Sequence, residues 1–575
     1  MSTAEFVGAK ASGRGCQWQG AEAVACRSAM INMRKFLVAF IALFLLCVTA
    51  QATTYTVKAG GGGNFTTIQA CANAAVNPGD TCAVYAGTYN EAVTLSHSGT
   101  GSSGVCTACI TFQVNPGDTV QVYGFRVLAS YVVINGFLIT DPALSHARAG
   151  VDIDGSWTGV QVLNNTITQV GADPCVMSHG STPASFITIS GNTISWCGAV
   201  PGQPNAGVRT GIEIAGDHFL VQNNVISHTI NGMSGDEDHS MIRGNTWGPV
   251  NDAADFPGCH ETSGCDTHAD FVELIQSSNT RGYVVIEGNI ENNILGVGGA
   301  HAWIGNPASG SVHVISRFNT EYSVGSGYLA NNGGTTNISY WKDYNNTLIS
   351  NQTQGVGGGN GTGVWVGAPN GAFLNNLMYN DVNPSGAQVA YYSVDGTSST
   401  GFVSGHNLAF DTGCVAGTKS SCTNGLFSTD AGNVYGDPKL VNPTTDFHLQ
   451  PSSPAIGAGG PLTAANGSGS SSTALTVNDA GFFQDGYGIA GVQPDWIRVG
   501  ASTTVRVSSI NYATNVITLA TAISWNNSDP VYLYKDSKGN LVLGGVLPNI
   551  GADQGPVGPP PTPPTPPTNP AAVPH

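Results

Sequence analysis

Residues 187–194 read Ile-Thr-Ile-Ser-Gly-Asn-Thr-Ile, a short β-branched strand that closes on Gly-Asn before a second short strand. The segments Val-Leu-Asn-Asn-Thr-Ile (162–167) and Leu-Val-Gln-Asn-Asn-Val-Ile (220–226) repeat this pattern. Asparagine suits a turn between strands because it tolerates left-handed backbone angles and its amide can bond an asparagine one repeat away. Since two short strands cannot bury an apolar face alone, the repeats are predicted to stack on one another.

The asparagine recurs about every thirty residues along the middle of the chain. The predicted anchors are Asn135, Asn165, Asn192, Asn224, Asn245, Asn289, Asn319, Asn346, Asn376 and Asn407, at steps of 30, 27, 32, 21, 44, 30, 27, 30 and 31 residues. A β-sandwich with strands every 8–12 residues is the alternative. The period near thirty and the repeated asparagine favour an all-β parallel β-helix of about ten coils.

The composition excludes several classes of protein. Of 575 residues, 77 are glycine and only 10% are charged, against about 7% and 25% in typical soluble domains. With 41% hydrophobic residues, the chain is not of the disordered class, and its abundant Gly and Asn disfavour a helical protein. The formal net charge of −17 excludes the basic surface that nucleic-acid binding requires. We expect a monomer with an acidic surface and no nucleic-acid partner.

The N-terminal residues 1–52 are predicted to be a signal peptide with an over-extended start. Met33-Arg-Lys35 precedes an apolar run over 36–50, and Ala-Gln-Ala (50–52) provides a cleavage site, as in secretory signals. The mature protein is therefore expected to be secreted, to the periplasm or outside the cell, without stable membrane insertion.

Ten cysteines follow the predicted cleavage site, in pairs that are close in sequence. The pairs are Cys71/Cys82, Cys106/Cys109, Cys175/Cys197, Cys259/Cys265 and Cys414/Cys422. Ten buried free thiols are the alternative, but export favours disulfides that staple loops.

The coils, their entry and their ending carry a family resemblance. The entry is Tyr-Thr-Val-Lys (55–58), Phe-Thr-Thr-Ile-Gln-Ala (65–70) and Val-Tyr-Ala-Gly-Thr-Tyr (84–89), and the ending spans 447–459 and 549–552. Together these motifs resemble the right-handed parallel β-helix proteins of the pectin-lyase-like superfamily, of the secreted bacterial type. The resemblance implies the fold, but not the reaction, because lyases, hydrolases, epimerases and non-enzymatic surface proteins share it.

The expected domain order follows. The β-helix covers 53–460 and its closing strand 541–555. Residues 461–540 alternate like strands and are predicted to form a small β-barrel-like insertion, of structural or carbohydrate-contacting use. The Pro-rich tail over 556–575 is expected to be disordered.

Aligning the strand that opens each coil on its preceding glycine predicts an outward column of acids followed by aromatic rings. The column reads Asp152, Glu213, Ser234, Glu273, then Trp303 or His301, Tyr328 and Trp365. Strands about 4.8 Å apart would space its carboxylates by about 5–10 Å, which spans both separations found in glycosidases. Asp152 and the four aromatic or histidine side chains are the predicted substrate-binding residues. The alternative is a solvated face with scattered rings.

The step of 44 residues between Asn245 and Asn289 predicts a long loop beside the densest acidic cluster. Long loops on rigid stacks often carry function. The predicted catalytic residues here and on neighbouring coils are Glu213, Asp236, Asp238, His268, Asp270, Glu273, Arg243 and Arg281. Asp266 and Asp270 are the candidate calcium ligands. An acidic loop that binds adventitious Ca²⁺ is the alternative.

The reaction class stays open at this point. Lyases of the resembled fold typically use a Lys or Arg base, often with Ca²⁺, whereas Lys342 is the one lysine between residues 59 and 418. A hydrolase would need only two or three carboxylates. The sequence therefore predicts a polysaccharide substrate and either a glycosidase-like carboxylate mechanism or a Ca²⁺-dependent polysaccharide lyase. The alternative is a non-catalytic, cell-surface or adhesive glycan-binding protein.

Overall fold

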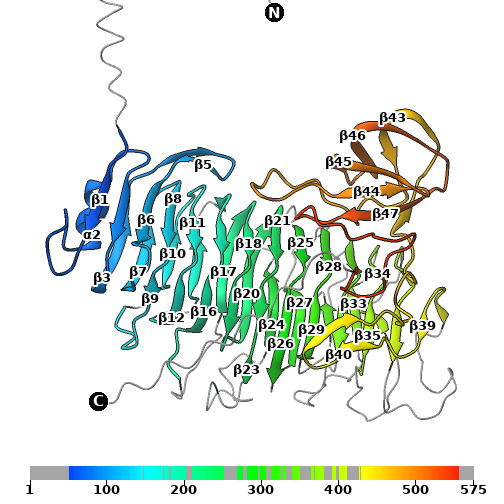
Figure 1. Cartoon of the computed structure of the whole chain (residues 1–575), viewed down its shortest axis with the longest axis horizontal. Coiled ribbons are helices and arrows are strands. Elements are labelled where there is room, and N and C mark those ends of the chain that lie inside the picture. Colours follow the sequence, from blue (N-terminus) through cyan, green and yellow to red (C-terminus); the bar gives the residue numbers. More distant parts are fainter. Residues whose placement is uncertain are drawn as a thin grey trace, which may run out of the picture. The chain divides into compact units, whose positions relative to one another are not determined.

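The computed structural model gives one β-helical body with an antiparallel module near its end (Figure 1). It describes residues 51–146, 148–171, 174–180, 183–201, 210–251, 255, 268–275, 282–295, 298–305, 313–324, 328–331, 340–349, 364–367, 370–380, 392–395, 400–410, 427 and 429–555. Among these residues no helix is long and apolar enough to cross a membrane.

Each coil contributes strands to three faces, and every strand pairs in parallel with those of the coils before and after it. Face 1 is the 13-stranded sheet of β1 (Thr54–Val57), β2 (Thr81–Val84), β6 (Ile110–Val114), β8 (Val132–Asn135), β11 (Gln161–Leu163), β15 (Thr188–Ser190), β18 (Leu220–Gln222), β21 (Ser240–Arg243), β25 (Tyr283–Glu287), β28 (His313–Arg317), β31 (Trp341–Tyr344), β34 (Ala372–Leu374) and β37 (Val403–Gly405).

Face 2 follows the asparagine turn of each coil. It holds β9 (Leu138–Ile139), β12 (Thr166–Val170), β16 (Thr193–Cys197), β19 (Val225–Ser227), β22 (Thr246–Trp247), β23 (Val250–Asn251), β26 (Ile290–Leu295), β29 (Thr320–Val324), β32 (Thr347–Ile349), β35 (Leu377–Tyr379), β38 (Leu408–Phe410) and β39 (Val434–Tyr435).

Face 3 completes the coil and leads back to face 1. It holds β3 (Gly87–Leu95), β7 (Val120–Val127), β10 (Val151–Asp154), β13 (Val176–His179), β14 (Ala184–Ser185), β17 (Thr210–Asp217), β20 (Asn231–Asp238), β24 (His268–Ile275), β27 (Gly298–Gly305), β30 (Tyr328–Asn331), β33 (Val364–Gly367) and β36 (Tyr392–Asp395). The predicted right-handed parallel β-helix is confirmed, in line with the strong right-handed preference of parallel crossovers.

Aliphatic side chains from all three faces fill the interior in layers. On face 3, Ile212 of β17 pairs with Met233 of β20 and Ile214 pairs with Gly235, and the side chains of Ile212, Ile214 and Met233 have no exposed surface. Burying each such side chain contributes about 1.5–3 kcal/mol. The short helix α2 (Ile68–Ala74) covers the N-terminal end through Ile68, Cys71 and Ala72.

The predicted asparagine ladder is present between faces 1 and 2. The Asn192 side-chain oxygen accepts hydrogen bonds from the backbone N–H and side-chain amide of Asn165, at 2.9 and 3.1 Å. In turn Asn192 donates from its backbone and side chain to Asn224, both at 2.9 Å. Each buried amide is thereby satisfied by neighbouring coils.

Two anchor assignments differ from the expectation. Asn135 pairs with Leu163, and the position under Asn165 belongs to Phe137, whose N–H donates to that asparagine at 3.0 Å. At the other end the ladder continues to Asn433, which accepts from the N–H of Asn407 at 2.8 Å. The left-handed backbone angle also lies one residue before the anchor, as at Asn164 and Asn223, so the anchor itself is selected for its hydrogen bonds.

Three predicted disulfides are confirmed: Cys71–Cys82, Cys106–Cys109 and Cys175–Cys197. The other two predicted pairs lie outside the described residues. Disulfides of this kind fit an exported protein.

The predicted C-terminal insertion forms an antiparallel sheet in the order β42 (Thr463–Ala464), β47 (Pro530–Lys535), β44 (Trp496–Val499), β45 (Thr503–Asn511), β46 (Val516–Trp525) and β43 (Gly469–Thr476). We call residues 461–540 the module. Two further hairpins are β4 (Thr100–Ser102) with β5 (Val105–Ala108) and β40 (Leu440–Asn442) with β41 (Asp446–Leu449).

The predicted closing strand over 541–555 is not a strand. The structure assigns no strand there beyond an isolated bridge at Leu541. Instead the N–H groups of Ile550 and Gly551 donate to the carbonyls of Ala455 and Asn375, at 2.9 and 2.8 Å. Ile550 is fully buried, so the segment covers the helix end with a side chain and needs no strand ladder.

Buried charges join the module to face 1. The Arg317 guanidinium of β28 donates to both carboxylate oxygens of Asp495, each at 2.8 Å, and to Glu287 at 2.7 Å. Arg317 and Asp495 have no exposed surface. Arg243 similarly donates to Ser537 at 2.9 Å and to the Gly491 carbonyl at 2.8 Å. Because buried ions need partners, each part of this joint depends on the other.

Replacing one ladder asparagine should destabilise the whole fold. Asn319→Ala leaves the Asn289 N–H and the Ile286 carbonyl without the bonds that they make at 2.9 and 3.0 Å. We expect a loss of about 2–4 kcal/mol in the free energy of unfolding, measured by urea denaturation. The exposed Asn73→Ala is the control, and equal losses in both variants would contradict the role of the ladder.

Replacing Arg317 by an uncharged residue should weaken the attachment of the module to the β-helix. Arg317→Met leaves the carboxylates of Glu287 and Asp495 buried without their shared partner, at a cost of about 3–5 kcal/mol. We expect limited proteolysis to cut within 461–540 in this variant before it cuts the β-helix. The triple variant with Glu287→Gln and Asp495→Asn should recover part of the loss, and unchanged proteolysis in Arg317→Met would refute the joint.

Candidate functional site

Face 3 brings the predicted outward residues into one row. Strand register aligns Arg126, Asp152, Met177, Glu213, Ser234, Glu273 and Trp303, each on its own strand from β7 to β27. The predicted order is confirmed over this stretch, except that the prediction omitted Met177. The alignment on glycines missed the strand of Met177 because no glycine opens β13. The row therefore places an additional strand between Asp152 and Glu213.

The row reaches Trp303 as predicted, since Trp303 aligns with Glu273, but its predicted continuation to Tyr328 and Trp365 is wrong. Trp303 pairs with Asn331, whereas Tyr328 pairs with Val364 and Trp365 pairs with Leu329. The three residues thus occupy three different register positions, because Tyr328 directly follows its glycine in the sequence whereas Trp365 is the second residue after its glycine. His301 lies on β27, two residues before Trp303. For these positions the structure describes the strands alone, and substrate binding by them stays a prediction.

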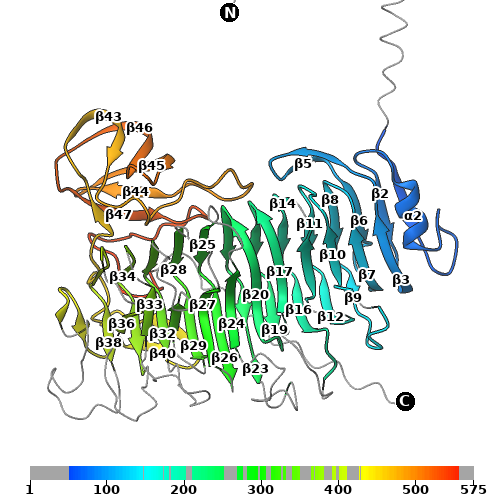
Figure 2. The ribbon, with the colours of Figure 1, turned by 180° about the vertical axis from the view of Figure 1, so that it is seen from behind.

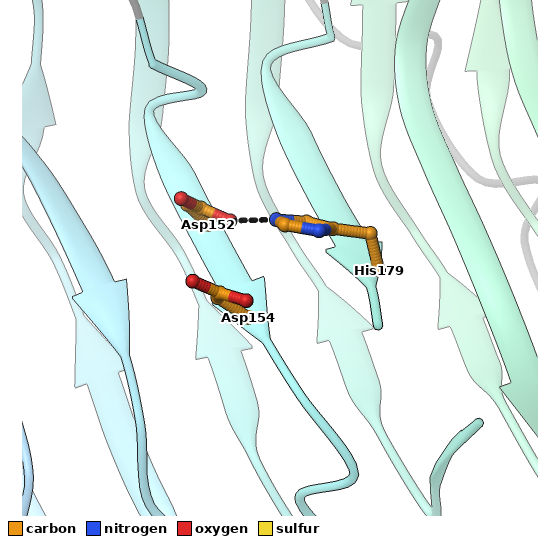
Figure 3. A group of neighbouring side chains, drawn as sticks. All are labelled: Asp152, Asp154 and His179. Atoms are coloured by element: carbon orange, nitrogen blue, oxygen red, sulfur yellow. Dashed lines mark hydrogen bonds and ion pairs between the residues drawn. The ribbon is translucent and has the colours of Figure 1, made fainter. Parts of the chain in front are cut away.

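Asp152 is the centre of a hydrogen-bonded group on β10 and β13. Its carboxylate is nearly buried, with 3% exposure. One oxygen bonds His179 Nε2 at 2.7 Å (Figure 3). The other oxygen accepts from Arg148 Nη1 at 2.7 Å. Asp154, two residues further on the same face of the strand, is paired with Arg126 of β7 through Nε at 3.0 Å.

The carboxyl groups on this face are in contrasting environments. The hydrogen bond from Arg126 holds the pKa of Asp154 below its ordinary value. Burial raises the pKa of Glu213, and the nearby His179 only partly opposes this. Carboxyl groups whose pKa values are pushed apart are the usual basis for one acid and one base at neutral pH.

A hollow of about 250 Å³ opens beside this group, next to β3 and β7. Its lining includes Tyr123, Arg126, His146 and Arg148. Asp141 fixes the loop that carries His146 by accepting from the His146 N–H at 2.7 Å. The site thus combines carboxylates, two guanidinium groups and two imidazoles around a space that can admit a small part of a ligand.

The other predicted acids lie further along face 3. Glu273 accepts from the side-chain amide of Asn231 at 2.9 Å, and Asn231 also accepts from the N–H of Asp270 at 3.1 Å. Asp270 is buried, while Asp236 is half-buried on β20. Glu273 is in the row and Asp236 and Asp270 lie on the same strands as its members, but none of the three is in the Asp152 group.

Two predicted catalytic residues, Asp238 and Arg243, make hydrogen bonds that hold parts of the chain together. Asp238 accepts from the backbone N–H groups of His239, Gly282 and Tyr283, at 3.0, 3.2 and 3.3 Å, and so holds a corner of the chain. The prediction for Arg243 is corrected: it is buried in the joint with the module, because face 1 and not face 3 carries β21.

Three predicted residues are not placed by the structure. Arg281 and Asp266 lie outside the described residues, and for His268 only the backbone of β24 is described. Their predicted roles remain untested.

The structure also gathers residues that sequence reasoning did not assign: Arg126, Arg148, His146 and His179. The sequence held one signal for the two arginines. Arg126 and Arg148 are among the few basic residues of a nearly lysine-free stretch, and both lie close to Asp152 in the sequence. Their convergence depends on strand register and on the conformation of the loop before β10, which the spacing of the repeats does not encode.

Asp152, Asp154 and His179 could hold a metal ion, since one ligand atom from each lies within 4.8 Å of the others. An imidazole with carboxylates suits Zn²⁺ or Mn²⁺ better than Ca²⁺, which prefers oxygen ligands. The two arginines already neutralise both carboxylates, so a cation has to compete with them. The predicted Asp266 and Asp270 calcium pair is not part of this group.

No protein-family model matches the sequence, and no curated protein matches it. Solved structures similar to this chain include pectate lyase Pel9A (15% identity, 73% of this chain and 94% of that chain, TM-score 0.38). They also include XylC in complex with xylose (11%, 84% and 100%, 0.40) and the pectin methylesterase from carrot (10%, 68% and 89%, 0.29). The resemblance to the pectin-lyase-like superfamily is thus one of fold, and the strand pairing of this chain is what establishes that fold.

Removing the guanidinium of Arg148 should raise the affinity of the Asp152 group for a metal ion. We expect Arg148→Gln to tighten Zn²⁺ binding about tenfold, or about 1.4 kcal/mol, because Asp152 then loses its cationic partner. Isothermal titration with zinc chloride measures the change. The exposed Arg506→Gln should leave the affinity unchanged, and equal affinities in all three proteins would refute competition between arginine and metal.

Proposed function

We propose that this protein is a secreted polysaccharide-cleaving enzyme whose site is the part of face 3 from β7 to β24. Glu213 is the general acid that protonates the glycosidic oxygen, and Asp154 is the carboxylate that activates water. The observation that carries the proposal is the opposite displacement of the pKa values of these two carboxyl groups. Such a pair matches the needs of glycoside hydrolysis.

The spacing of the strands supports an inverting hydrolysis. The strands β10 and β17 are separated by β13, which places them about 9.6 Å apart. Inverting glycosidases hold their carboxyl groups about 6.5–9.5 Å apart, with room for the attacking water. Asp154 lies two residues beyond the position that aligns with Glu213, which adds about 6.6 Å along the strand. The proposal therefore requires both side chains to lean toward each other to bring their carboxyl groups into that range.

In this proposal the remaining polar groups position the substrate. Asp152 orients the imidazole of His179, and the half-exposed ring can accept or donate a hydrogen bond to a sugar hydroxyl. The hollow at Tyr123 and His146 can receive a neighbouring sugar unit. The other predicted acids, Asp236, Asp270 and Glu273, extend the acidic face along the same row of coils.

A β-eliminating lyase is the second candidate, and the two arginines favour it. Arg126 and Arg148 are half-exposed beside the hollow and can neutralise a uronate carboxylate while His179 removes a proton. As the proton leaves, the C–O bond to the leaving sugar breaks and the released oxygen takes up a proton. The uronate product then carries a double bond conjugated to its carboxylate, which absorbs ultraviolet light. Calcium dependence would further point to the predicted Asp266 and Asp270 ligands.

The decisive experiment is a screen of plant, algal and bacterial polysaccharides with and without EDTA. We expect new reducing ends without a rise in ultraviolet absorbance. A rise in absorbance would replace the hydrolase by the lyase, and the absence of any cleavage across the panel would leave a glycan-binding protein.

The pH profile should be bell-shaped. Activity rises with pH as Asp154 loses its proton below the ordinary range of aspartate, and it falls as Glu213 loses its proton above the ordinary range of glutamate. Glu213→Gln should lower kcat by about 100-fold or more and remove the falling limb. Asp437→Asn, an exposed acid elsewhere, is the control, and a retained falling limb in Glu213→Gln would exclude Glu213 as the acid.

A further inference from the structure

Six rings stack along the corner where face 3 turns into face 1. They are Phe186, His218, His239, Tyr283, His313 and Tyr340, with successive ring centroids 4.4, 5.4, 4.8, 4.6 and 4.5 Å apart. One ring comes from each coil, because each follows the end of a face 3 strand or opens a face 1 strand. The stack is therefore a continuous aromatic edge along the axis of the helix.

The module adds two further rings to the middle of this edge. Tyr487 meets His239 edge-on, at 5.3 Å and 85°, and Tyr512 meets Tyr283 at 5.0 Å and 31°. Tyr512 is held in place by a hydrogen bond to the Phe483 carbonyl at 2.9 Å. Both pairs are geometries that aromatic side chains favour, so the module packs its rings against this edge of the helix.

A cleft of about 760 Å³ lies at this meeting of the module and the β-helix. Its lining includes His239, Tyr283, Asp485, Tyr487, Asn511 and Tyr512. The module is seen beside β25 and β28 in Figure 2. The cleft is separate from the hollow next to β3 and β7, with which it shares no lining residue.

We propose that this cleft is a second glycan-binding site, which takes a segment of a neutral polysaccharide. The tyrosine and histidine side chains that line the cleft combine an apolar body with a polar edge, which suits the C–H groups and hydroxyls of sugars. Asn511 and Asp485 stand at the same cleft and supply an amide and a carboxylate for sugar hydroxyls. A concave site with aromatic walls and a few polar groups is the general form of a small-ligand site.

The charge of the cleft selects a neutral chain over a uronate polymer. The described lining residues include Asp485 but no lysine or arginine. Asp238 lies directly behind His239 and is bonded to it. An acidic polysaccharide would bring its carboxylates next to these two aspartates, which costs free energy at low ionic strength.

The contacts between module and helix suit a binding site that both of them line. Arg317 and Asp495 fix the module on face 1, and Asp485 fixes the turn beside the cleft by accepting from the N–H groups of Tyr487 and Ile510, both at 3.2 Å. Walls contributed by two parts of the chain can bind a ligand tightly only if their relative position is fixed beforehand. This proposal does not depend on catalysis at Glu213.

Filling the cleft tests the proposal. Ser508 and Ala513 are exposed and line it, so Ser508→Trp and Ala513→Trp fill the space without removing a contact. Thr504→Trp places the same side chain at an exposed position of β45 that is not among the described lining residues. The assay is native affinity electrophoresis in gels that contain soluble xylan, mixed-linkage β-glucan, galactomannan or polygalacturonate.

We expect at least one neutral polymer to retard the wild-type protein. Both filling variants should bind that polymer at least about tenfold more weakly than the wild type does. Thr504→Trp and Glu213→Gln should bind like the wild type, which separates this site from face 3. Retardation by polygalacturonate alone, no retardation by any neutral polymer, or equal binding by the filling variants and Thr504→Trp would each overturn the proposal. Thermal unfolding confirms that each variant is folded.

Discussion

Each coil from Asn165 to Asn407 buries a side-chain amide that bonds the coils on either side. Asn245 illustrates the constraint: it accepts from Asn224 and donates to Asn289, at 2.9–3.0 Å, and its amide also bonds the Val221 carbonyl. An unsatisfied amide at this depth costs about 1–3 kcal/mol. These coils therefore cannot slip in register without breaking several bonds at once, and the ladder fixes the positions of their strands on all three faces.

Two groups of charged residues have different physical consequences. On face 1, Arg317 and Asp495 are fully buried, so their pairing fixes the module and either residue alone would be strongly destabilising. On face 3, Arg148 is half-exposed and pairs with a nearly buried Asp152. An exposed cation contributes little to stability but remains available to a ligand. The same pairing of guanidinium and carboxylate thus serves attachment in one place and is suited to binding in the other.

The repeat determined what could be predicted from the sequence. The turns at Asn165, Asn192 and Asn224 specified the period, the parallel stacking and the row from Asp152 to Glu273, because a ladder position and a strand register are local properties of each coil. Where a coil departs from the pattern, prediction failed. Phe137 replaces the asparagine of the first ladder position, and no glycine opens β13, so Asn135 was chosen wrongly and Met177 was missed.

Contacts between segments that are far apart in the sequence could not be predicted from the repeat. Arg243 belongs to a strand of face 1, and its environment is set by Ser537, almost three hundred residues away. Similarly, His146 and Arg148 reach the face from a loop whose course depends on Asp141. Neither the spacing of repeats nor the local pattern of apolar residues contains this information, because it arises only when separate segments pack together.

The ladder also limits what chemistry face 3 can perform. Because register is fixed, the separation of two groups on this face is set by the number of strands between them, in steps of about 4.8 Å. The strand that carries Met177 and His179 lies between β10 and β17, so two steps separate the strand of Asp152 and Asp154 from that of Glu213. Without that strand the aligned Asp152 and Glu213 would start one step apart, near the separation of about 5–5.5 Å used by retaining glycosidases. The coil of β13 is therefore what leaves space for a water molecule between the proposed acid and base.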